Sequence, residues 1–71
     1  MEALKAAKVI YVEFVKAYVE ARDLRDQVTT GFMACMAGRG VGPSQELMDE
    51  CDAQEALVDR LKTELGRALG A

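Results

Sequence analysis

The residues best suited to chemistry in this chain are thiols and thioethers near its centre. Met33, Cys35 and Met36 precede a glycine-rich segment, and Met48 and Cys51 follow it. Thiolate and thioether groups are soft ligands that suit copper(I), so their convergence would make a soft-metal site. Methionine and cysteine are also common gap-fillers where helices pack irregularly, and these spacings match no metal signature. We therefore expect no metal and no cofactor, and soft-metal binding is the least favoured of three hypotheses.

The two cysteines are expected to be free thiols, because we expect a cytoplasmic location for this chain. No apolar stretch approaches the ~20 residues of a membrane span, and no secretory signal is visible. A turn centred on Val41 sets Cys35 level with Leu47, about 6 Å along the axis from Cys51, which disfavours a disulfide. A turn centred nearer Pro43 would bring the two cysteines level, so their pairing depends on the loop.

The segment Gly38–Pro43 has some features of a phosphate-binding loop, because Ser44 begins a helix whose free N–H groups could hold an anion. No strand precedes the segment and no Lys-Ser or Lys-Thr pair follows it. Helix capping and a tight turn account better for the glycines. The acidic residues that come next are interpreted as a solvated helix face, with a cation or a basic partner as the alternative. They are Glu46, Asp49, Glu50, Asp52, Glu55 and Asp59.

Length and charge exclude several classes of function. The chain has 71 residues, a net charge of −3 and no histidine. So short a chain buries only about 60% of its unfolded surface, which leaves little room for a catalytic pocket and favours a partner or a second copy. Histidine is the commonest general base and metal ligand, and the acidic balance opposes binding to phosphates. We expect no enzyme and no small-molecule substrate, and nucleic acid is not the favoured partner.

The sequence predicts an all-α fold and a single domain over residues 1–71. Helix breakers concentrate in residues 38–43 and separate two amphipathic helices, about residues 2–37 and about 44–69. A connection this short makes them an antiparallel hairpin. Thr29-Thr30-Gly31 could bend the first helix, although we expect it to be continuous. The rows predicted to face each other are Ala7, Ile10, Phe14, Ala17, Ala21, Leu24, Val28 and Cys35 in the first helix, and Leu47, Cys51, Val58, Leu61, Leu65 and Ala68 in the second.

Arg25 and Gln54 stand where the apolar pattern asks for hydrophobic residues. The turn centred on Val41 places Gln54 level with Val28, so the two polar side chains are predicted to lie at comparable heights. A bond from the Arg25 guanidinium to Gln54 or Glu50 would fix the register of the helices. The alternative is that Arg25 lays its stem along the rim and keeps its charge in water.

The segment Val9–Val19 is apolar around most of the helix rather than along one face. Because Ile10, Phe14 and Ala17 face the second helix, the valines would be exposed in an isolated hairpin. Such patches usually mark interaction surfaces. We therefore expect a homodimer, a four-helix bundle with Val9, Val12, Val15 and Val19 at its interface and Phe14 and Tyr18 at the edge.

The leading hypothesis is a non-enzymatic protein–protein interaction module, a small adaptor, chaperone or inhibitor that self-associates through its first helix. A different protein is the alternative partner for the same surface. The second hypothesis is a Rop-like hairpin dimer that binds RNA or another nucleic acid, a similarity of geometry without a shared motif. It would need a basic stripe, yet Lys5, Lys8, Lys16 and Arg22 are interleaved with Glu13, Glu20 and Asp23.

Overall fold

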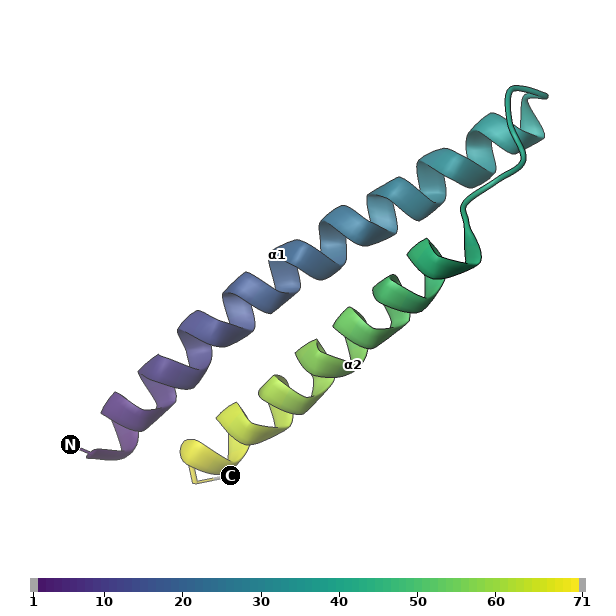
Figure 1. Cartoon of the computed structure of the whole chain (residues 1–71). Helices are drawn as coiled ribbons and strands as arrows, with labels where there is room; N and C mark the ends of the chain where they lie inside the picture. Colours follow the sequence, from purple (N-terminus) through teal and green to yellow (C-terminus); the bar gives the residue numbers. More distant parts are fainter. Residues whose placement is uncertain (1, 71) are drawn as a thin grey trace.

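Two long antiparallel helices make up the fold. The computed structural model describes residues 2–70, in which α1 spans Glu2–Met36 and α2 spans Gln45–Ala68. The helices lie side by side in a rod of 56 × 16 × 14 Å, and the chain starts and finishes at the same end of it (Figure 1). The predicted all-α helical hairpin is confirmed, and each predicted helix limit lies within one residue of the observed one.

The ends of the helices are capped by residues that the sequence marks for this role. Gly38 has a φ of +75°, its N–H donates to the Cys35 carbonyl at 3.0 Å, and the Arg39 N–H donates to the Ala34 carbonyl at 2.8 Å. This pair of bonds satisfies carbonyls that the end of α1 would otherwise leave without partners. At the start of α2 the Leu47 N–H donates to the Ser44 hydroxyl at 3.0 Å, so Ser44, where this helix was predicted to begin, is its N-cap.

The first helix is continuous through Thr29-Thr30-Gly31, as predicted. Gly31 serves the packing of the loop rather than a bend. A Cβ at Gly31 would lie 3.0 Å from the Pro43 nitrogen, closer than a side chain normally approaches backbone. The missing side chain therefore lets the loop lie against α1.

The connection between the helices runs back along α1 and is longer than the predicted tight turn. Figure 1 shows that the last turns of α1 extend past the first turn of α2 at the loop end of the hairpin. The Gln54 side chain reaches the backbone of Ala17, not the level of Val28. Its neighbour Glu55 pairs with Arg25, so Gln54 lies between the levels of Ala17 and Arg25 and not at Val28, and the predicted level was wrong. The error arose because a turn centred on Val41 requires α2 to begin level with the end of α1.

The core between the helices is thin and built mainly from small residues. Ala7, Ala17 and Ala21 of α1 and Cys51 and Leu61 of α2 are buried, and no side chain described is completely shielded from water.

Cys35 is exposed, so its predicted place in the α2-facing row was wrong. The half-buried positions of the last turns are instead Gly31 and Ala34. Beyond Val28 it is the returning loop that covers α1, and this shifts the covered side of the helix.

Candidate functional site

An exposed apolar strip runs along the side of α1 that α2 leaves uncovered. Its residues are spaced by three, four and seven positions, which places their side chains on one broad face of the helix. Each keeps between 39% and 58% of its surface exposed. This surface, called the α1 strip below, comprises Leu4, Tyr11, Val12, Val15, Tyr18 and Val19.

Most of the residues predicted for an interface lie on the α1 strip, namely Val12, Val15, Tyr18 and Val19. Val9 is exposed beside the strip, on a flank of α1 that also carries lysines. Phe14 is half-buried against α2, and its ring stacks on Tyr18 with centroids 6.2 Å apart.

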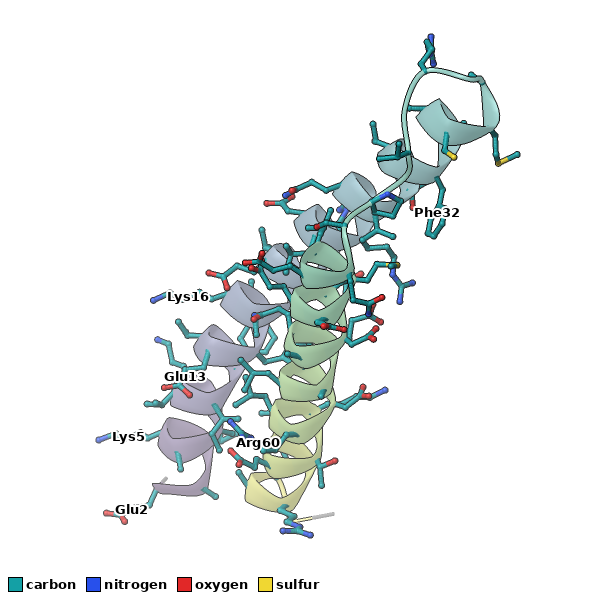
Figure 2. The ribbon with its side chains drawn as sticks, turned by 45° about the vertical axis from the view of Figure 1, so that its right-hand side comes forward. Glu2, Lys5, Glu13, Lys16, Phe32 and Arg60 are labelled. Atoms are coloured by element: carbon teal, nitrogen blue, oxygen red, sulfur yellow. The ribbon has the colours of Figure 1, made fainter. Side chains whose placement is uncertain are left out.

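Leu4 and Tyr11 extend the α1 strip, although neither was predicted for the interface. Their seven-residue spacing to each other and to Tyr18 is the signal that could have assigned them to the strip. The charged residues of α1 lie mainly beside it. Lys5, Glu13 and Lys16 project from the side of α1 that is turned away from α2 (Figure 2).

The outer side of α2 is charged, in contrast to that of α1. All the large apolar side chains exposed within the two described helices belong to α1. The acidic residues of α2 are exposed as predicted, except Glu55, which is half-buried against α1. No group of three histidine, cysteine or carboxylate side chains within residues 2–70 is placed to hold a metal ion. Neither helix of this part of the chain is long and apolar enough to cross a membrane.

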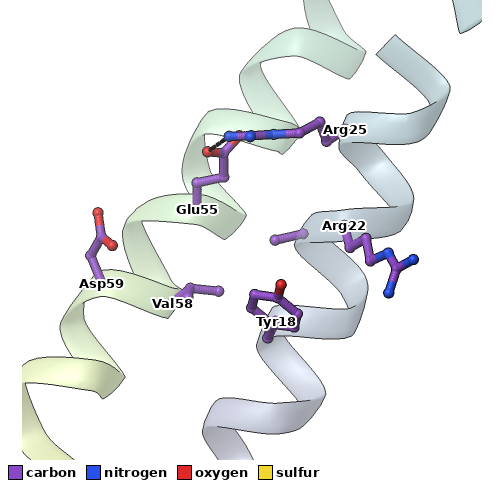
Figure 3. A pocket seen from close by; sticks show the side chains of 7 residues that line it. Tyr18, Arg22, Arg25, Glu55, Val58 and Asp59 are labelled. Atoms are coloured by element: carbon purple, nitrogen blue, oxygen red, sulfur yellow. Dashed lines mark hydrogen bonds and ion pairs between the residues drawn. The ribbon is translucent and has the colours of Figure 1, made fainter. Parts of the chain in front are cut away.

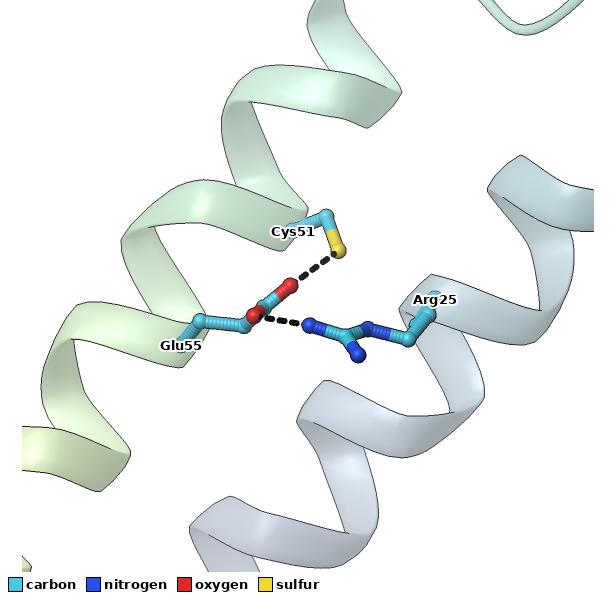
Figure 4. Close-up of polar contacts among 3 residues, drawn as sticks. All are labelled: Arg25, Cys51 and Glu55. Carbon is cyan, nitrogen blue, oxygen red and sulfur yellow. Dashed lines mark hydrogen bonds and ion pairs between the residues drawn. The ribbon is translucent and has the colours of Figure 1, made fainter.

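Three polar side chains join the helices near their middle (Figure 4). Arg25 of α1 forms an ion pair with one carboxylate oxygen of Glu55, and the Cys51 thiol donates to the other at 3.2 Å. The bonds from Cys51 and Arg25 lower the pKa of Glu55. Burial, followed by the bond to Glu55, raises the pKa of the Cys51 thiol, and the bond to Glu55 raises the pKa of Arg25.

The predicted contact between Arg25 and Gln54 is therefore wrong in its partner, although both side chains do bond across the helices. Arg25 meets Glu55 rather than Gln54 or Glu50. Gln54 instead donates its amide to the Ala17 carbonyl at 3.3 Å. Arg25 and Gln54 have these partners because the loop runs back along α1. It sets α2 further from the tip of the hairpin than a turn centred on Val41 would.

A shallow groove of about 180 Å³ lies beside this ion pair, between the two helices (Figure 3). Ligand pockets usually enclose about 300–1,000 Å³, so the groove is small for a substrate site. In this groove the ring of Tyr18, a residue of the α1 strip, lies near both basic and acidic side chains. Its walls are formed by Tyr18, Ala21, Arg22, Arg25, Glu55, Val58 and Asp59.

The sulfur atoms considered for a soft-metal site do not converge. Cys51 lies beside the Arg25–Glu55 pair, whereas Cys35 is ten residues further along α1, about 15 Å by helical rise. Met33 and Met36 are exposed near the tip, and Met48 is half-buried on α2. The sulfur atoms stay apart because α2 begins away from the tip of the hairpin.

Comparison with protein-family models, with curated proteins and with solved structures finds no match for this chain. The candidate functional site is the α1 strip, on the strength of its own exposure and chemistry.

Proposed function

We propose that this protein is a non-enzymatic protein–protein interaction module that forms a homodimer through the α1 strip. The observation that carries the proposal is the exposure of the strip, since α2 covers only the opposite side of α1. A contiguous apolar surface of this kind is uncommon on a monomer and usually marks a binding site. Tyrosines such as Tyr11 and Tyr18 are also favoured at interfaces, because they combine a large apolar ring with a polar tip.

The proposed dimer places the two copies of α1 at its centre and one copy of α2 on each outer side. The distribution of exposed residues supports this arrangement, because the outer face of α2 is charged and has no large apolar side chain to share. The four helices then form an assembly in which α1 contacts two neighbours and α2 contacts one. This matches the two apolar faces of α1 and the single apolar face of α2.

The energy available from the strip suits a reversible dimer. Covering the exposed half of each strip side chain contributes about 1 kcal/mol, roughly half the value for complete burial. The sum over both copies must offset an association cost of about 4–15 kcal/mol. Six side chains in each of two copies supply about 12 kcal/mol, so a dissociation constant near the micromolar range corresponds to an association cost at the lower end of this range, about 4 kcal/mol.

Sedimentation equilibrium of the wild type and a Val15→Glu variant tests the proposal. Val15 lies in the middle of the strip, so the substitution would bury an unpaired carboxylate in the dimer and raise the dissociation constant at least about a hundredfold. Ala56→Glu is the matched control, because Ala56 is exposed on α2. A wild type that is monomeric at tens of micromolar, or a Val15→Glu variant that dimerises like the wild type, would contradict the proposal.

A further inference from the structure

The valines of the α1 strip are flanked by charged residues at the same seven-residue spacing. One row of exposed side chains reads Lys8, Val15 and Arg22, and a neighbouring row reads Val12, Val19 and Asp26. The first row has one valine between two bases, and the second has two valines followed by an acid. The three valines therefore have a base, Lys8, on the side of the N-terminus of α1, and a base and an acid, Arg22 and Asp26, on the side of the loop.

Lys8 and Asp26 carry opposite charges but are too far apart to pair within one chain. They are 18 residues apart on one continuous helix, which corresponds to about 27 Å. Neither forms an ion pair in the part of the chain that the structure describes, where Arg25 and Glu55 make the only such bond. A second copy of α1 is the surface that can bring these two charges together.

The relative direction of the two copies decides which charges meet. A parallel pair in register sets Lys8 against the partner's Lys8 and Asp26 against the partner's Asp26, so every charged layer is repulsive. An antiparallel pair sets one row against the other. When Val15 lies beside the partner's Val19, the same alignment brings Lys8 beside the partner's Asp26.

That alignment also places Arg22 beside the partner's Val12. The aliphatic stem of an arginine can cover a valine while its guanidinium stays in water. Asp26 is four residues from Arg22, so the guanidinium remains close to the acid of its own helix. The antiparallel arrangement thus covers all three valines and leaves no charge facing a like charge in these layers.

We propose that the second copy binds antiparallel along α1, with Lys8 of each chain paired to the partner's Asp26. This inference rests on the proposed homodimer and adds its direction and register. The two symmetry-related pairs lie at the rim of the interface. Rim pairs contribute little to affinity but discriminate between orientations.

Charge reversal tests the orientation. Lys8→Asp should weaken the dimer about tenfold at low salt, because each of its two symmetry-related contacts changes from attraction to repulsion. Asp26→Lys should weaken it by a similar factor. The double variant K8D/D26K should return the dissociation constant to within about threefold of the wild type, since the opposite charges are restored in exchanged positions. In a parallel dimer, Lys8→Asp would only replace one like-charge pair by another.

Sedimentation equilibrium of these variants, with circular dichroism as a check on folding, separates failure of the orientation from failure of the dimer. Arg60→Asp on α2 is the matched control for net charge, and it should leave the dissociation constant unchanged. A dimeric wild type with an unaffected Lys8→Asp variant overturns the antiparallel arrangement and leaves the homodimer standing. A K8D/D26K double variant that dimerises as weakly as the single variants also overturns the antiparallel arrangement. A monomeric wild type overturns both proposals.

Discussion

Arg25 and Glu55 form an ion pair that ties α1 to α2 near the middle of the hairpin. The second oxygen of the Glu55 carboxylate accepts a hydrogen bond from the Cys51 thiol. Glu55 therefore links Arg25 of α1 to Cys51, a buried residue of α2. Small helical hairpins have few buried side chains to fix their register. A polar contact with a unique partner selects one alignment of the helices among those that the alanine-rich seam would tolerate.

The bonds that Glu55 forms with Arg25 and Cys51 predict that the free energy of unfolding depends on pH. Because the pKa of Glu55 is lower in the folded chain than its ordinary value of 4.5, the carboxylate stabilises the fold above that pH. This contribution is lost as the pH falls through the lowered value. Urea unfolding of the wild type and Glu55→Gln should show a larger difference in unfolding free energy at pH 7 than at pH 3. Equal differences at the two pH values would show that ionisation of Glu55 does not stabilise the fold.

Replacement of Gln54 by leucine should stabilise the hairpin by about 1 kcal/mol. Gln54 is half-buried in the seam, and its amide bonds to Ala17, whose carbonyl keeps its own helical bond when the side chain is removed. Leucine adds apolar contact where the heptad pattern asks for it. Gln54→Ala is the control and should destabilise by about 1 kcal/mol, since it loses contact and bond together. Chemical denaturation measures both, and a less stable Gln54→Leu variant would show that the bond outweighs the packing.

Two glycines within the helices should respond differently to alanine. A Cβ at Gly66 meets nothing within 4 Å, so Gly66→Ala should stabilise by about 0.5–1 kcal/mol through helix propensity. At Gly31 the same gain is opposed by the contact with Pro43, at 3.0 Å from its nitrogen. Thermal unfolding should therefore rank Gly66→Ala above the wild type and Gly31→Ala clearly below Gly66→Ala. Equal gains at both positions would mean that the loop does not rest on Gly31.

The two thiols should react at very different rates. Cys35 is exposed, whereas Cys51 is buried, has a raised pKa and donates to Glu55. The thiolate is the reactive form, so a thiol reagent should modify Cys35 quickly in the native protein and Cys51 only when the hairpin opens. Cys35→Ser should abolish the fast phase, and Cys51→Ser should preserve it. A fast phase that survives in Cys35→Ser would indicate that the Cys51 region opens readily.

Nucleic acid should bind weakly at physiological salt. The bases of α1 are interleaved with acids along the helix, and the exposed side of α2 is largely acidic, so few phosphates can be neutralised at once. A gel-shift series with a structured RNA and a duplex DNA should show no binding below about 10 µM at 150 mM salt, where non-specific affinities are typically about 1–100 µM. Submicromolar binding to either would favour the alternative function of a nucleic-acid-binding hairpin.

Local sequence signals determined the elements of this fold. Three glycines and a proline in one short segment predicted the single break, and Ser44 and Gly38 marked the ends of the helices, because caps and breakers act through neighbouring backbone groups. The periodicity of apolar residues also separated the side of α1 that faces α2 from the valines that do not. These properties follow from 3.6 residues per turn and need no knowledge of tertiary contacts.

Only the tertiary structure decided the register of the helices. The path of the loop along Gly31 placed Gln54 between the levels of Ala17 and Arg25 and not at Val28, paired Arg25 with Glu55, and separated Cys35 from Cys51. A sequence pattern repeats every seven residues and fits several alignments equally well. The choice among them depends on the close approach of Pro43 to a helix position without a side chain, and on polar contacts between residues 30 or more positions apart in the chain.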